Sequence, residues 1–118
     1  MRRLVVLFLC LSAPAVAAPP PVGSEDWQIM RPYADWIQRQ NGPLGWCCNV
    51  ADGRPVDARM VQDHWQVRIL HPETLPEAPS GWVDVPETAL LHGENPTGFP
   101  IAWFYNGSVR CFIPGSAT

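Results

Sequence analysis

The residues of this chain best suited to chemistry are three cysteines, Cys47, Cys48 and Cys111; a fourth, Cys10, lies in the apolar stretch at the start of the sequence. In an oxidising compartment thiols form disulfides, and an odd number leaves one sulfur without a partner inside the chain. We therefore expect one structural disulfide, from Cys47 or Cys48 to Cys111. Closing a loop of about sixty residues stabilises a fold by about 4 kcal/mol in the chain-entropy model.

Other uses of these cysteines stay open. Adjacent residues of an extended segment point to opposite faces, so only one of Cys47 and Cys48 can face Cys111; the other is a free thiol or a link to a second chain. The alternatives are a vicinal Cys47–Cys48 disulfide, a metal site with His64 or His71, and a catalytic cysteine with a histidine base. No histidine is singled out by its spacing, so we predict no catalytic residue, no metal and no cofactor.

The six tryptophans are many for 118 residues, and most of them must lie in the core. An indole ring left at the rim offers a large flat surface for a sugar ring or a peptide at low entropic cost. The predicted binding surface comprises Trp46, Trp82, Trp103 and Arg110.

The first seventeen residues have the pattern of a secretory signal peptide. Arg2 and Arg3 precede an apolar run over residues 4–11, and Ala15 and Ala17 supply the small side chains that signal peptidase requires, so we expect cleavage after Ala17. The apolar run is too short to span the membrane, which takes about twenty residues. The protein is therefore expected to be periplasmic or secreted, with no membrane span.

The charge of the expected mature chain argues against nucleic acid as a partner. Without Arg2 and Arg3, six arginines stand against eleven acidic residues, a net charge of −5, and the chain has no lysine. A nucleic-acid-binding protein needs a basic face. The expected partner is instead a protein or glycan of the cell envelope.

The remaining chain is expected to form one small disulfide-linked domain over residues 32–115, after a flexible proline-rich segment over residues 18–31. Ser24 could cap a helix, but Pro32 would interrupt it early. We therefore predict a helix over residues 32–40 that begins at Pro32 and places Tyr33, Trp36 and Ile37 on one face.

Strand patterns dominate after this helix. Residues 64–70 alternate so that Trp65, Val67 and Ile69 are buried while Gln66 and Arg68 face water. A second, shorter strand is expected over residues 81–86, and residues 87–91 fit either one helical turn or a strand. The predicted fold is α+β and mainly β, with one short N-terminal helix on a bent antiparallel sheet of four or five strands, or a partly open small barrel.

Asn106-Gly107 between two β-rich runs predicts a hairpin with a type I′ turn. The expected pairs are Tyr105 with Ser108, Phe104 with Val109, Trp103 with Arg110 and Ala102 with Cys111. The core face would carry Ala102, Phe104, Val109, Cys111 and Ile113. The opposite face is too apolar for solvent, so the helix or another strand should cover it, and Trp103 and Arg110 could form a cation–π pair there.

Several ordered motifs resemble those of small exported alphaproteobacterial proteins of unknown function. They are Trp46-Cys47-Cys48 with Ala51-Asp52-Gly53-Arg54, then Gly81-Trp82-Val83-Asp84-Val85-Pro86, Asn95-Pro96-Thr97-Gly98 and Cys111-Phe112-Ile113-Pro114. The resemblance covers residues 32–114, and some similar sequences have a further cysteine at the position of Gly53. It implies export and the domain boundaries, and no activity.

Three functions follow as hypotheses. The first is a binding or accessory module of the cell envelope without catalysis. The second is a thiol-dependent enzyme or redox protein that uses Cys47 or Cys48. The third is a structural subunit joined to a partner through an unpaired cysteine.

Overall fold

The computed structural model describes a short helical segment and a curled antiparallel sheet, over residues 19–42, 45–47 and 53–116. The helical segment consists of α1 (Glu25–Met30), the 3-10 turn η1 (Arg31–Tyr33) and α2 (Ala34–Gln38). The strands are β1 (Asn41–Gly42), β2 (Gly45–Trp46), β3 (Gly53–Val61), β4 (His64–Ile69), β5 (Val83–Asp84), β6 (Ile101–Tyr105) and β7 (Ser108–Ile113). Two further 3-10 turns are η2 (Pro72–Thr74) and η3 (Glu87–Ala89). This confirms the predicted α+β, mainly β class.

The helical segment begins earlier than predicted. The Ser24 side chain accepts a hydrogen bond from the backbone N–H of Trp27 at 3.2 Å and caps α1. Pro32 does not end the helix, because it occupies the start of η1, where the change to a 3-10 turn accommodates its missing N–H. The predicted start at Pro32 is therefore wrong, and part of the expected flexible segment 18–31 is helical.

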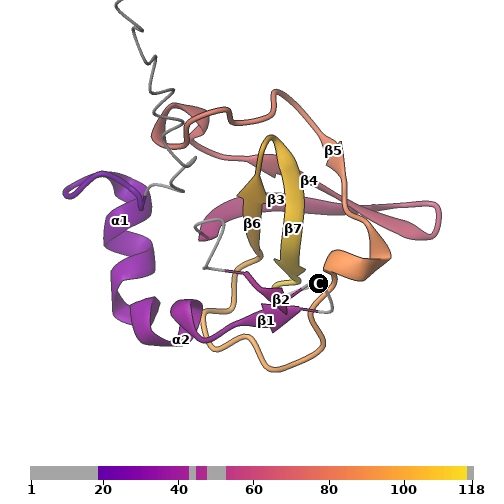
Figure 1. Ribbon diagram of the computed structural model, residues 1–118, viewed down its shortest axis with the longest axis horizontal. Coiled ribbons are helices and arrows are strands. Elements are labelled where there is room, and N and C mark those ends of the chain that lie inside the picture. The colour runs from indigo at the N-terminus through magenta and orange to yellow at the C-terminus, as the bar shows by residue number, and fades with distance from the viewer. Residues whose placement is uncertain (1–18, 43–44, 48–52, 117–118) are drawn as a thin grey trace, which may run out of the picture.

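Five strands form one bent sheet in the order β5-β4-β3-β6-β7, and β1 and β2 form a separate two-stranded sheet. Figure 1 shows β6 and β7 crossing β3 and β4 steeply, with the helical segment to one side. The predicted strand over residues 64–70 is confirmed as β4, and the strand over residues 81–86 is reduced to the two residues of β5. Residues 87–91 contain both expected forms, because η3 leads to a parallel bridge between Leu90 and Phe112.

The longest strand, β3, has two different partners along its length. Gly53 to Pro55 pair with β6, and Val56 to Val61 pair with β4. Pro55 lies where pairing with β4 has not yet begun, so its missing N–H removes no bond from that ladder. The central strand can therefore contain a proline.

The β6–β7 hairpin follows the predicted register only next to its turn. Tyr105 pairs with Ser108 and Phe104 with Val109, and Asn106 and Gly107 have positive φ values of 50° and 76°. A bulge between Trp103 and Phe104 then shifts the register, so that Trp103 faces Cys111 and Ala102 faces Phe112. The predicted pairs of Trp103 with Arg110 and of Ala102 with Cys111 are wrong, because the bulge inserts one residue into β7.

The same bulge redistributes the core over both faces of the hairpin. One face contributes Ala102, Phe104, Val109 and Phe112 to the cluster inside the curled sheet. The other contributes Ile101, Trp103, Cys111 and Ile113 to a cluster with Met30 and Ile37. Cys111 and Ile113 thus lie on the face opposite to the predicted one, and the helical segment covers that face as expected.

Candidate functional site

An aromatic and charged surface lies on the outer side of β3, β4 and the segment that enters β5. Trp82 is partly buried, and the guanidinium carbons of Arg59 and Arg68 lie 4.0 and 4.9 Å from its ring centroid. These distances fit cation–π contacts. We call this surface the Trp82 face; its residues are Asp57, Arg59, His64, Gln66, Arg68, Trp82 and Asp84.

Strand register brings these side chains together. Arg59 lies opposite Gln66, and Gln66 lies opposite Asp84, so the three occupy one row across the sheet. Asp57 lies opposite Arg68 in the next row. Directly opposed residues share a face, and the alternation predicted for residues 64–70 places Gln66 and Arg68 on the outside.

A chain of hydrogen bonds fixes the row around Gln66. Its Oε1 accepts from Nε and Nη2 of Arg59 at 2.9 and 2.7 Å, and its Nε2 donates to Oδ1 of Asp84 at 2.8 Å. His64 Nε2 lies 3.0 Å from the same oxygen. The hydrogen bond from Gln66 lowers the pKa of Asp84, and the one from His64 lowers it further.

The two arginines of the Trp82 face differ in their partners. Arg68 Nη2 donates to Oδ2 of Asp57 at 2.7 Å. Within the described part of the chain, Arg59 bonds to the neutral amide of Gln66 and to no carboxylate. Among the described residues, Arg59 therefore presents a positive charge that Gln66 holds in place and that no carboxylate pairs with, which suits the binding of an acidic group.

A second polar cluster is buried between α1 and η2. Asp26, which is 1% exposed, has its Oδ1 2.6 Å from Nδ1 of His71, and its Oδ2 lies 3.1 Å from Oγ1 of Thr74. That hydroxyl is also 2.8 Å from the carbonyl oxygen of His71, and it accepts a hydrogen bond from Nε of Arg54 at 3.2 Å. Arg54 is 1% exposed and donates from Nη2 to the carbonyl oxygen of Thr74 at 2.9 Å.

Asp26 and His71 form a carboxylate–imidazole pair that joins the helical segment to the sheet. The hydrogen bond that His71 donates to Asp26 raises the pKa of His71 against the opposing effect of desolvation, and the charges of Asp26, Glu25 and Glu73 raise it further. Nε2 of His71 lies 3.4 Å from Oε2 of Glu25. An imidazole between two carboxylates is favoured in its protonated, positively charged form. The pair therefore joins α1 to the residues that follow β4.

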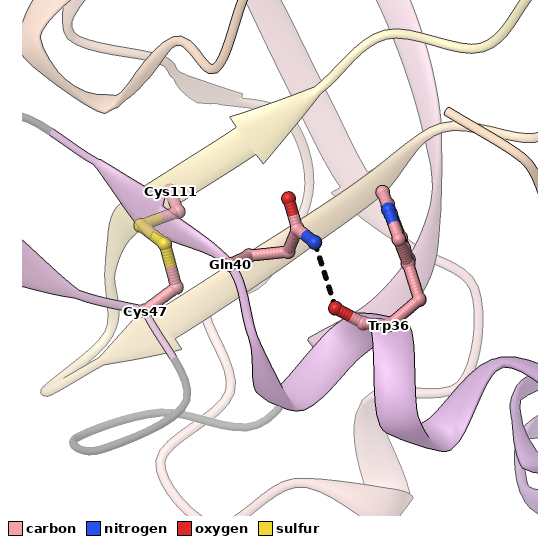
Figure 2. The surroundings of a disulfide bond; sticks show 4 residues. All are labelled: Trp36, Gln40, Cys47 and Cys111. Atoms are coloured by element: carbon pink, nitrogen blue, oxygen red, sulfur yellow. Dashed lines mark hydrogen bonds between the residues drawn. A yellow bond between two sulfur atoms is a disulfide. The ribbon is translucent and has the colours of Figure 1, made fainter. Parts of the chain in front are cut away.

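The predicted disulfide joins Cys47 to Cys111, with 5.8 Å between their Cα atoms. Figure 2 shows the bond connecting β7 to the residue that follows β2. Cys47 is held by a hydrogen bond from its N–H to the carbonyl oxygen of Gln40, whose side chain donates to the carbonyl oxygen of Trp36 at 2.7 Å. Cys47 and Cys111 are 0% and 1% exposed, so the bond is shielded from other thiols.

The other predicted site residues differ in how exposed they are. Trp103 is wholly buried and cannot belong to a binding surface, so that prediction is wrong; its indole nitrogen has no hydrogen-bond partner in the described part of the chain. Trp82 is partly exposed, as a binding residue requires, whereas Arg110 is partly buried beside the bulge. Cys48 and the Trp46 side chain lie outside the described residues.

Sequence reasoning missed the cluster around Asp26 and the row through Gln66. Asp26 and His71 are 45 residues apart, and Gln66 bonds to groups on both neighbouring strands. The one available signal was the alternation in β4, which places Gln66 outward without identifying its neighbours.

Among the described residues, no three histidine, cysteine or acidic side chains lie together so that they could hold a metal ion. Over the same residues, every helix is too short or too polar to cross a membrane. Comparison of the chain with protein-family models, with curated proteins and with solved structures finds no match.

Proposed function

We propose that this protein is an exported binding or accessory module of the cell envelope, and that it binds a protein or glycan with the Trp82 face. The observation that carries the proposal is the partly exposed indole of Trp82 with two guanidinium groups against its ring. Hydrogen bonds to Gln66 and Asp57 hold those groups in place before any ligand arrives. Preorganised aromatic and arginine side chains lose little entropy on binding.

Export is supported by two independent features. The disulfide between Cys47 and Cys111 belongs to an oxidising compartment. The signal-peptide pattern of residues 1–17 supplies the route. We expect the protein isolated from cells to begin after Ala17 and to contain the disulfide, both of which mass spectrometry of the intact and digested protein measures.

The redox alternative loses support at Cys47, because that sulfur is buried in a disulfide. Cys48 keeps the third hypothesis open as a prediction. If Cys48 links this chain to a partner, non-reducing electrophoresis of native material shows a larger species that Cys48→Ser removes.

Capture from envelope extract tests the binding proposal. We expect the wild-type protein to capture a specific envelope protein or glycan. The amount captured by Trp82→Ala should be lower by at least about tenfold. Tyr105→Ala is the matched control, because Tyr105 is an aromatic residue 40% exposed at the other end of the sheet. Equal capture by Trp82→Ala and wild type would refute the proposal.

A further inference from the structure

A pocket of about 190 Å³ lies between the helical segment and the start of β3. The helical segment supplies most of its wall, Pro19 and Pro20 line it from the proline-rich segment, and Gly53 lines it from β3. The described residues that line it are all different from those of the Trp82 face, so this is a second and separate site.

The wall is mainly apolar because of the spacing of residues along the helical segment. Trp27, Arg31 and Ala34 line the pocket and follow one another at helical spacing, so their side chains share a face. Met30 and Ile37 also line it and are otherwise buried. An apolar group in the pocket would therefore be removed from water against apolar side chains.

Arg31 gives this apolar pocket one positive charge. Its guanidinium carbon lies 5.0 Å from the ring centroid of Trp27, a distance that fits a cation–π contact. Among the described residues, no carboxylate pairs with this guanidinium, and none of those that line the pocket is acidic. A carboxylate is the group that complements a guanidinium in charge and shape.

The volume of the pocket limits the size of its ligand. A cavity of about 150 Å³ holds one benzene molecule, whereas pockets for drug-sized ligands measure about 300–1,000 Å³. The pocket therefore has room for one ring, or for an alkyl chain of similar size, with a carboxylate beside it.

We infer that this pocket binds a small monocarboxylic acid with one apolar ring or short chain. The apolar part lies against Trp27 and Met30, and the carboxylate pairs with Arg31. The carboxyl end of a peptide fits less well, because its amide groups need hydrogen-bond partners and the lining has few polar side chains. The inference does not depend on the proposed function, since Trp82 does not line the pocket.

NMR titration of the isotope-labelled mature protein with phenylacetate, indoleacetate and hexanoate tests the inference. We expect at least one of these acids to bind with a Kd below about 1 mM and to shift the amide signals of Trp27, Arg31 and Ala34. The corresponding alcohol, such as phenylethanol, should bind at least about tenfold more weakly, because it lacks the charge that pairs with Arg31.

Arg31→Gln should remove the preference for the acid over the alcohol. Arg39→Gln is the matched control, because Arg39 ends the same helical segment and does not line the pocket, and it should keep that preference. Ala34→Leu should weaken the binding of acid and alcohol alike by about tenfold, because the larger side chain fills part of the pocket.

Three results would overturn the inference. They are the failure of all three acids to shift these signals, a preference for the acid that Arg31→Gln leaves unchanged, and tighter binding of the tripeptide glycyl-glycyl-phenylalanine than of the acids. Trp82→Ala should bind the acids as the wild type does. Loss of envelope capture in that variant therefore tests the proposed function alone, and the acid titration tests this inference alone.

Discussion

Two histidines at the ends of the same strand have different surroundings. His64 begins β4 and shares Asp84 with Gln66 on an exposed surface. His71 follows the strand and contacts a carboxyl group that is 1% exposed. A buried acidic group needs compensating donors, so His71 contributes more to folding than its position in a loop suggests.

The pH dependence of stability should report this contact. The pKa of His71 is raised above 6.5 in the folded state, so its stabilising effect is complete below about pH 6.5 and is lost as pH rises through the folded-state value. We expect wild-type stability to fall, relative to His71→Asn, as pH rises above about 6.5 through the range in which His71 loses its proton in the folded state. Urea denaturation across this range measures it.

His92→Asn is the control for this effect, because His92 is exposed. It should keep the wild-type profile. A His71→Asn variant with the same pH dependence as wild type would contradict the role given to His71.

β3 packs closely on β6 at Gly53, which pairs with Trp103. A Cβ atom at position 53 would lie 3.2 Å from the Trp103 ring and from Cγ2 of Ile101, and both of those residues are fully buried. Such side chains cannot withdraw into solvent.

Gly53→Ala should lower the free energy of unfolding by about 1–3 kcal/mol through overpacking. Gly93→Ala is the matched control, because nothing lies within 4 Å of its added Cβ atom, and it should change stability by less than about 0.5 kcal/mol. Chemical denaturation of both variants measures the difference. Equal stability of the two variants would show that β6 yields to the added methyl group.

Local patterns predicted most of the sheet and failed where partners are distant. The alternation in β4 and the Asn106-Gly107 turn were sufficient for those elements. The bulge at Trp103 was not predictable, because the Asn106-Gly107 turn fixes only the pairs beside it and gives no sign of an extra residue further along β7. The long strand β3 was not predicted, because Pro55 argues against a central strand. Proline fits at this position because β3 changes from β6 to β4 as its partner there.

The disulfide joins two segments that are far apart in the sequence. Cys47 and Cys111 are 64 residues apart, and they link the residue after β2 to the last strand. Such a bond restricts the unfolded chain over most of the domain. The small core of a domain of this size makes that contribution a large share of its stability.

Cys47→Ala should destabilise the protein by about 4 kcal/mol and leave Cys111 reduced. Cys48→Ala should retain the disulfide and the wild-type stability. Urea denaturation together with thiol mapping by mass spectrometry measures both. Loss of the disulfide in Cys48→Ala instead would show that Cys48, and not Cys47, pairs with Cys111.

The sequence by itself determined the class of fold, the strand β4 and the hairpin turn, and it favoured a bond from Cys47 or Cys48 to Cys111 over the other uses of these cysteines, because each follows from local alternation or from the chemistry of one residue type. The tertiary structure decided that Cys47 makes that bond, that Trp103 is core while Trp82 is surface, and that Asp26 meets His71. Those outcomes depend on which distant segments become neighbours, and no local pattern contains that information.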